Sequence, residues 1–350
     1  MASVVVPRAI DFFPPTPQAY NFLLNVFQYF PVVTIALWLL SFYPAGKTSF
    51  ARSHLNFPGR IAWFAMEIVG SINLLFILFT LPQKVDVPTT TELPGWNKLT
   101  AALYIIHYIN RAIISPFTAP SVSPVHASVA ACAALFNWLN TVCIGGWLVG
   151  YETAVVGWKV DGARSDAHHL LPQRLLPCLG VVTFFLGMAG NIQAERELHR
   201  LRRAEADRRV REKEQTTGQA TDPRNRYSKV YVIPPEKGLF RSILFPHYTF
   251  EWIEWFGFVL VGTAIFPSPS PSISSSFATP PIKLVPWLVP AAMLAEKLQI
   301  PLPLPALIFL VNTITNMLPR ARWGRSWYVN KFGEKAVAGR GAVIPWVTWL

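Results

Sequence analysis

The chain contains about seven apolar runs of the length that a helix needs to cross a lipid bilayer. A bilayer core is ~30 Å thick, so a spanning helix needs about 20 apolar residues. The predicted spans are Tyr20–Tyr43, Arg60–Leu81, Trp96–Phe117, Ala127–Tyr151, Leu175–Ala194, Ile243–Phe266 and Leu284–Leu318. Only 14% of the residues are charged and 52% are hydrophobic, whereas soluble domains carry about 25% charged residues. The sequence therefore predicts an all-α integral membrane protein.

The first and last apolar runs differ from a simple spanning helix. The last run is longer than one span requires, and prolines interrupt it between residues 286 and 305, so we expect a kinked span with an interfacial lead-in. Residues 1–19 carry few charges and a proline-rich break, so the first span is expected to be a signal-anchor and not a cleaved leader. Cys132, Cys143 and Cys178 lack metal-ligand spacing and are interpreted as small apolar side chains.

The net charge of +12 is unevenly distributed. Basic residues concentrate in residues 47–60, 195–241 and 320–340, and with seven spans these three segments share one side of the membrane. Cytosolic loops of membrane proteins carry an excess of Lys and Arg. The charge pattern therefore predicts a lumenal N-terminus and a cytosolic C-terminus.

We interpret residues 1–350 as a single membrane domain with core spans in residues 20–194 and 243–318. Ala204–Arg226 is highly charged, and we expect it to continue the fifth helix before it becomes a disordered loop. Ser268–Pro281 is rich in Ser and Pro and is expected to be a linker that does not pack. Residues 319–350 would then form a cytosolic tail.

Glu67 is a carboxylic acid inside the second apolar run. A charged group at membrane depth costs several kcal/mol unless it is paired or lines a polar cavity. On a helix, Glu67 shares a face with Gly70, Ser71 and Leu74, so small and polar groups flank the acid. One interpretation is an acid neutralised by a proton or by a neighbouring helix. The interpretation that we favour is a binding or catalytic group in a buried cavity.

Further polar groups lie in or beside the third and fifth runs. His107 and Tyr108 stand four and three residues before Arg111, which could also reach the interface by snorkelling. Asn191, Glu195 and Arg202 form one helical stripe that leads out of the membrane. The stripe is either a solvated helix end or a polar wall that reaches a phosphate-bearing ligand, to which arginine is well suited.

The sixth run begins with His247, Glu251 and Glu254 on one helical face. A metal site would need more converging ligands than this stripe supplies, so no metal is expected. The chain also lacks a GxGxxG turn after a strand and a Walker A loop, which excludes the common nucleotide-binding motifs.

Several of these motifs, taken in order, resemble the steroid 5-alpha-reductase family, also called 3-oxo-5-alpha-steroid 4-dehydrogenases. The resemblance covers nearly the whole chain and is most specific in its C-terminal half. It rests on Arg60–Glu67 (RIAWFAME), His107-Tyr108 with Arg111, Leu186–Ile192 (LGMAGNI), Leu201-Arg202, Tyr231 with Ile233-Pro234, Gly238–Phe240, Glu251–Gly257 (EWIEWFG), Trp327-Tyr328 with Lys331-Phe332, and Ala342–Pro345 (AVIP). Ala45–Thr48 (AGKT) belongs to the same series.

The resemblance implies a seven-helix protein of the endoplasmic reticulum membrane that uses NADPH to reduce a carbon–carbon double bond conjugated to a ketone. Glu67 and Tyr108 would bind the substrate's 3-keto oxygen. The remaining matched positions would line the cofactor pocket: Arg111, Asn191, Glu195, Arg202, Tyr231, His247, Glu251 and Tyr328. The expected partners are a hydrophobic small molecule and membrane lipids, with no nucleic acid.

Departures from the family pattern leave the substrate open. His247 follows Pro246 as in the related polyprenol reductases, and the usual His-rich stretch before Trp327 is replaced by Pro319–Ser326 (PRARWGRS). Three alternatives to a reductase of 3-oxo-Δ4 steroids therefore remain: a polyprenol-pathway reductase, a trans-2-enoyl-CoA reductase, and a non-catalytic sterol- or lipid-binding protein.

Overall fold

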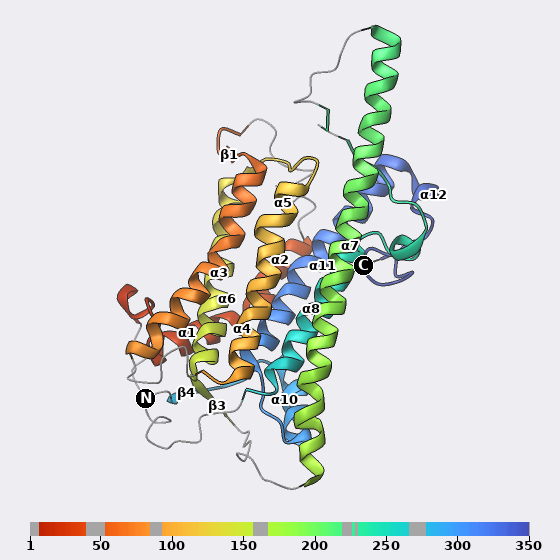
Figure 1. The fold of residues 1–350 in the computed structure, drawn as a ribbon. Coiled ribbons are helices and arrows are strands. Elements are labelled where there is room, and N and C mark those ends of the chain that lie inside the picture. Colours follow the sequence, from red (N-terminus) through yellow and green to blue (C-terminus); the bar gives the residue numbers. More distant parts are fainter. Residues whose placement is uncertain are drawn as a thin grey trace.

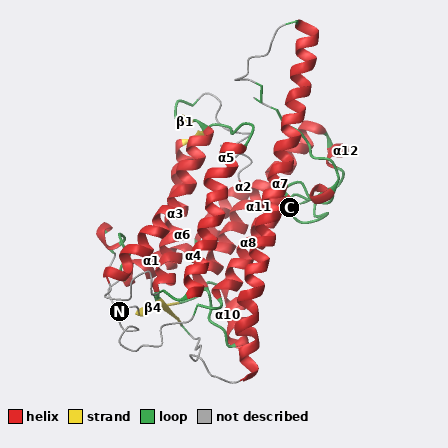
Figure 2. Ribbon diagram, in the orientation of Figure 1, coloured by secondary structure: helices red, strands yellow, loops and turns green. Residues whose placement is uncertain are grey.

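The computed structural model describes residues 7–39, 53–84, 93–156, 167–218, 226–227, 230–265 and 278–349, and this part is predominantly helical (Figure 2). The α-helices are α1 (Pro17–Gln28), α2 (Phe30–Leu39), α3 (Gly59–Lys84), α4 (Gly95–Tyr108), α5 (Ser115–Thr118), α6 (Ala127–Val149), α7 (Ala167–Thr217), α8 (Pro246–Gly262), α10 (Val289–Leu298), α11 (Leu304–Phe332) and α12 (Glu334–Val337). A π-helix, η4 (Ile109–Ile114), joins α4 to α5. Short 3-10 helices are η1 (Ala9–Asp11), η6 (Gly238–Phe240) and η7 (Pro286–Leu288).

Two small sheets lie outside the helices. β1 (Asn56–Phe57) pairs antiparallel with β2 (Val125–His126), and β3 (Glu152–Val155) pairs in parallel with β4 (Ala278–Ile282). The second pair corrects the prediction that Ser268–Pro281 does not pack, because its last residues form β4 and Thr279 donates a hydrogen bond to the Glu152 carbonyl. Local Ser/Pro composition could not reveal a partner strand more than 100 residues away.

Four helical stretches of the described chain are long and apolar enough to span a membrane: Pro17–Leu39, Gly59–Lys84, Ala127–Val149 and part of α7. They correspond to the first, second, fourth and fifth predicted spans. The third predicted span is the continuous series α4, η4 and α5, and the sixth corresponds to α8. The elements therefore support an integral membrane architecture, and the total of seven spans stays a prediction.

The last predicted span is divided differently from our expectation. α10 ends at Leu298, Gln299 adopts a left-handed conformation with φ of 52°, and α11 starts only after Pro303. α11 then continues past residue 318 to Phe332, so part of the predicted cytosolic tail is helix. The break follows from Pro301 and Pro303, because proline lacks the N–H that a helix interior needs.

Helix α7 is the longest element and projects well beyond the bundle (Figure 1). Its 51 residues correspond to about 76 Å, more than twice the thickness of a bilayer core. The helix continues through residue 217, which agrees with the expected extension of the fifth span. Residues 219–225 of the predicted loop lie outside the described chain, as do residues 40–52 with the AGKT motif.

Close approach of glycines sets the packing of α7 against α8. A Cβ placed on Gly187 would lie 2.4 Å from the Glu254 backbone nitrogen, and one on Gly257 would lie 2.4 Å from that of Phe184. No side chain fits at such distances, so these positions let the two backbones approach, as small residues do in membrane helix pairs. α3 packs against α6 in the same bundle.

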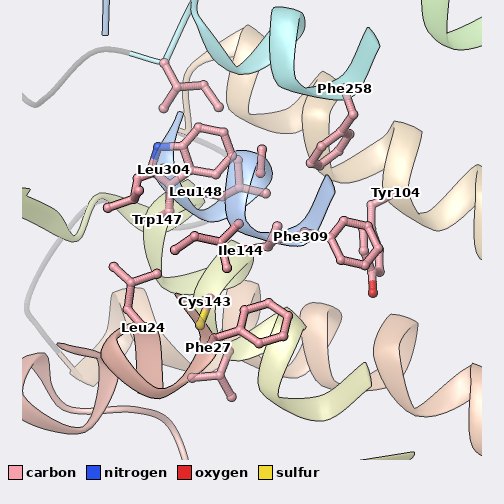
Figure 3. Close-up of a cluster of buried hydrophobic side chains, with 14 of the residues drawn as sticks. Leu24, Phe27, Tyr104, Cys143, Ile144, Trp147, Leu148, Phe258, Leu304 and Phe309 are labelled. Carbon is pink, nitrogen blue, oxygen red and sulfur yellow. The ribbon is translucent and has the colours of Figure 1, made fainter. Parts of the chain in front are cut away.

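Aromatic and aliphatic side chains from several helices fill the interior (Figure 3). Tyr104, Phe258 and Phe309 approach one another from α4, α8 and α11, with ring centroids of Tyr104 and Phe309 6.2 Å apart. Cys143 lies in this cluster, in agreement with its interpretation as a small apolar side chain, whereas Cys132 and Cys178 are exposed. The core lies beside α4 and so supports the polar groups described next.

The short elements lie at two opposite ends of the helix bundle (Figure 1). The β1–β2 pair, α5 and α12 lie toward the end from which α7 projects, whereas η1, the β3–β4 pair and α10 lie toward the other. The polar stripe of α7 therefore leads to the end that also carries the C-terminal elements.

Candidate functional site

One arginine contacts three carboxylates inside the helix bundle. Arg111 Nε lies 3.6 Å from Glu67 Oε1, and Arg111 Nη1 lies 3.7 Å from Glu195 Oε1 and 3.8 Å from Glu251 Oε2. Asn191 donates a hydrogen bond to Glu251 Oε2 at 3.3 Å. The sequence predicted all five residues as site residues from separate spans, and the structure brings them together in one acidic cluster.

Glu67 and Tyr108 are connected through a third residue, Asn137 of α6. The Tyr108 hydroxyl donates to Asn137 Oδ1 at 2.8 Å, and Asn137 Nδ2 donates to Glu67 Oε2 at 3.1 Å. The same nitrogen also donates to the Met66 carbonyl at 2.9 Å. The acid and the phenol therefore face one interior position and share a single amide, a residue that the sequence analysis missed.

The environment of the phenol is aromatic. Tyr108 stacks on Tyr104 with ring centroids 4.6 Å apart, and the Tyr104 hydroxyl accepts a hydrogen bond from Asn140. The residue before it, His107, forms a buried 2.8 Å pair between its Nδ1 and Glu254 Oε1 and packs on Trp255. Stacking and pairing restrict the rotamers of this turn of α4, which holds the Tyr108 hydroxyl in place.

The π-helix η4 immediately follows Tyr108 and contains Arg111. A π-helical turn holds one more residue than an α-helical turn and is frequent at functional sites. After it, Ser115 donates a 2.7 Å hydrogen bond to Glu195 Oε2. η4 thus positions Arg111 and Ser115 so that they contact Glu195 from the same helical segment.

A second group of predicted residues lies farther along the projecting end of the bundle. Arg202 donates to the Ser121 hydroxyl at 2.6 Å and interacts electrostatically with Tyr231 and Tyr328. Lys331 Nζ lies 4.5 Å from the centre of the Tyr231 ring. This group combines two cations with aromatic rings, a combination that suits a ligand with phosphates and a planar ring.

Tyr328 lies past the end of the last predicted span, packed against Phe245 and Phe332. Burial raises the pKa of Tyr328 to about 12, so the phenol stays neutral at physiological pH. His247 contacts the rings of Phe245 and Tyr248. His247 also interacts electrostatically with Glu251, so the candidate site consists of two neighbouring parts that His247 connects.

The C-terminal tail is held against this second part by Arg340. Its side chain is 3% exposed and donates hydrogen bonds to four backbone carbonyls, those of Pro234, Ala336, Val337 and Phe240. The tail also adds backbone bonds, with Leu244 and Phe245 donating to the carbonyls of Gly341 and Ala342. A fully buried arginine that crosslinks three segments was not predicted from the sequence.

Within the described residues, no group of three or more His, Cys, Asp or Glu side chains is arranged to hold a metal ion. His247 of the predicted stripe turns toward aromatic rings, Glu251 toward Arg111, and Glu254 toward His107. The acidic groups are therefore engaged by cationic or amide partners.

Comparison with known proteins agrees with this arrangement. The family model described as 3-oxo-5-alpha-steroid 4-dehydrogenase matches residues 121–268. Steroid 5-alpha-reductase DET2 of Arabidopsis thaliana is 27% identical over 82% of the chain and 80% of its own length, and 3-oxo-5-alpha-steroid 4-dehydrogenase 1 of Bos taurus is 25% identical over 71% and 82%. The chain is similar to the steroid 5-alpha-reductase family over most of its length. An uncharacterized protein of Schizosaccharomyces pombe is 28% identical over 94% of the chain and 99% of its own length.

This similarity indicates an oxidoreductase that acts on CH–CH bonds. The matched range contains Asn137, Asn191, Glu195, Arg202 and Glu251, and so covers residues of both parts of the site. The missed residue, Asn137, had a detectable signal, because an amide inside an apolar run is costly unless it is satisfied. Arg340 gave no comparable signal, because it lies among exposed basic residues of a tail.

Proposed function

We propose that the protein reduces the carbon–carbon double bond of a 3-oxo-Δ4 steroid with NADPH. The similarity to this family supports a reductase, and the relatives from Arabidopsis thaliana and Bos taurus, which are steroid reductases by name, support a steroid substrate. The observation that carries the proposal is the hydrogen-bonded series Tyr108–Asn137–Glu67 in a buried position. It presents an acid and a phenol at the depth where an apolar ketone would reside.

The chemistry explains why these groups are useful. The reduction adds a hydride to the β-carbon of the enone and a proton, which water would supply, to the α-carbon. Hydride addition moves negative charge onto the carbonyl oxygen, and donors already aimed at that oxygen stabilise the transition state. When the ketone binds, the Tyr108 hydroxyl would turn its one proton from Asn137 Oδ1 to the carbonyl oxygen, while Glu67 keeps Asn137 in place beside the phenol.

The cofactor would be held by the two parts of the site. NADPH, when bound, supplies the hydride. Arg202 and Lys331 have the charge to bind phosphates, and the rings of Tyr231 and Trp327 offer stacking surfaces near them. Glu195 and Glu251 would stabilise positive charge that develops on the nicotinamide side, because three carboxylates of the cluster share only Arg111.

We further propose seven spans in the endoplasmic reticulum membrane, with a lumenal N-terminus and a cytosolic C-terminus. The proposal is supported by four helical stretches of spanning length and by the clustering of α12, α5 and the projecting part of α7 toward one end (Figure 1). This end carries the Arg-rich segments, which cytosolic faces favour.

A substrate panel tests the function. Membranes that contain the protein are supplied with NADPH and, in parallel, with testosterone, a polyprenal or a trans-2-enoyl-CoA, and the products are identified. We expect saturation of the steroid double bond. A product only from the polyprenal or the enoyl-CoA would show that this compound, and not the steroid, is the substrate. Measurable sterol binding without NADPH oxidation would indicate a non-catalytic protein.

Two variants test the mechanism within the same assay. Removing one preorganised donor typically lowers kcat about 100- to 1,000-fold, so we expect losses of that order for Tyr108→Phe and a large loss for Glu67→Gln. Tyr151→Phe is the matched control, because it removes a buried hydroxyl that bonds the Pro15 carbonyl and lies outside the Tyr108–Asn137–Glu67 series. Equal activity of Tyr108→Phe and the control would contradict the assigned role.

A further inference from the structure

The face of α7 turned away from the candidate site carries a regular stripe. Leu175, Leu179, Val182 and Leu186 recur at alternating steps of four and three, and their side chains are 46–64% exposed. The same spacing continues through Ala189, Gln193, Arg196 and Arg200. With 100° per residue, the stripe lies on the side of the helix opposite Asn191 and Glu195.

The polar end of the stripe borders a cavity. A hollow of about 780 Å³ lies between this face of α7 and residues 235–240. Arg196 and Arg200 line it from α7, and Lys237 lines it from the opposite wall, together with apolar groups such as Leu239. The hollow thus combines an apolar lining with three cations.

The charges of this hollow are not balanced. Glu197 also lines it, but Arg200 already binds that carboxylate through two hydrogen bonds of 2.6 and 2.8 Å. Among the residues that the structure describes, no hydrogen-bond or ion-pair partner is found for the side chains of Arg196 and Lys237. Two cations therefore remain available to an anionic ligand.

The depth of these cations matches a membrane interface. A ~30 Å hydrocarbon core corresponds to about 20 helical residues. Counted from Leu175, the core ends near residue 195, one position before Arg196. The exposed Leu and Val side chains would then face acyl chains, and Arg196 and Arg200 would lie at the level of phosphate groups.

We propose that this hollow binds one anionic phospholipid. Arg196 and Lys237 hold the phosphate and headgroup, and an acyl chain follows Leu186 and Val182 along the outer face of α7. The continuity of the hollow with an exposed apolar stripe favours a lipid over a free phosphate ion, because a free ion would gain nothing from that stripe. The site is distinct from the substrate and cofactor region, which lies on the opposite face of α7.

Lipid retention by the full chain tests the proposal. The purified protein is placed in nanodiscs of phosphatidylcholine that contain a small fraction of phosphatidylserine, and lipids that stay bound are measured by native mass spectrometry. Each basic residue near an anionic membrane surface contributes about fivefold in binding. We therefore expect the double variant Arg196→Gln/Lys237→Gln to retain about 25-fold less phosphatidylserine than the unaltered protein.

The matched control is Arg211→Gln/Lys213→Gln, which likewise removes one Arg and one Lys, from the part of α7 about 22 Å beyond Arg196. It should retain phosphatidylserine normally. An equal loss of phosphatidylserine retention in both double variants would show that net charge alone causes the effect, and would overturn the proposal. Retention of phosphatidylcholine at the same level, or displacement by millimolar inorganic phosphate, would also overturn it. None of these outcomes depends on catalytic activity, so they are separate from a failure of the proposed reductase function.

Discussion

Replacing Asn137 by Leu removes the residue that joins the acid and the phenol. The side chain is 3% exposed and makes hydrogen bonds to Tyr108, Glu67 and the Met66 carbonyl. Hydrogen bonds between membrane helices contribute about 0.6 kcal/mol on average and up to ~1.7 kcal/mol. Loss of three such bonds predicts a destabilisation of about 2–5 kcal/mol, and we expect Leu to fill the space of the amide.

The effect on catalysis should exceed the effect on substrate binding. Without Asn137, the hydrogen-bonded link between the Tyr108 hydroxyl and Glu67 is lost, so the orientation of the donor is less restricted. We expect kcat to fall about 10- to 100-fold with KM changed little, because a positioning defect acts mainly on the transition state. The assay is product formation per folded protein, together with thermal unfolding in detergent.

A double-mutant cycle then isolates the connection. In the unaltered background, Glu67→Gln and Tyr108→Phe should show combined losses smaller than the product of the single losses. In the Asn137→Leu background the two effects should become independent. The control Asn140→Leu removes one hydrogen bond, to Tyr104, one turn along the same helix. Independent effects in both backgrounds, or equal kcat losses in the two Asn variants, would refute the bridging role.

Three other perturbations test separate parts of the structure. Gly187→Ala should lower stability by about 1–3 kcal/mol, because the added Cβ must displace the backbone of Glu254, whereas Gly95→Ala meets no atom within 4 Å and should be neutral in thermal unfolding. Arg340→Gln should raise the KM for NADPH several-fold with little change in kcat, because the tail beside Tyr328 loosens; unchanged KM would contradict this. Tyr328 has a folded-state pKa raised to about 12 against an ordinary 10, so stability should be constant below pH 10 and fall above it. Tyr328→Phe should flatten that alkaline decline, and an identical decline in both proteins would count against the buried phenol.

The sequence predicts the helical spans well because spanning helices have a strict length and an apolar composition. The starts of α3 and α6 agree with the predicted spans to within one residue. The split between α10 and α11 was not predicted in detail, because several prolines in one run offer several possible breaks. Pairing of β3 with β4 depends on tertiary contact and leaves no periodic pattern in such short segments.

The candidate site could likewise be predicted only in part. Glu67, Arg111, Asn191, Glu195 and Glu251 could be selected as polar groups at membrane depth, and the structure places them within one cluster. Their connection through Asn137 could not be derived, because the sequence does not state which face of α6 meets α3. A search for every buried amide in an apolar run would have added Asn137 to the candidates.

The π-helix between Tyr108 and Ser115 has a consequence for how this segment can change in length. A π-turn amounts to one inserted residue, so deleting a single amino acid from Ile109–Ile114 would restore ordinary helical winding and leave the span nearly as long as before. Because the extra residue is accommodated inside the π-turn, Tyr108 and Ser115 would both keep their present facing. The same deletion in the regular part of α4 would instead rotate everything after it by about 100° around the axis and carry Ser115 away from Glu195. The segment can thus lose one codon at this place and at no neighbouring place without turning the following helix.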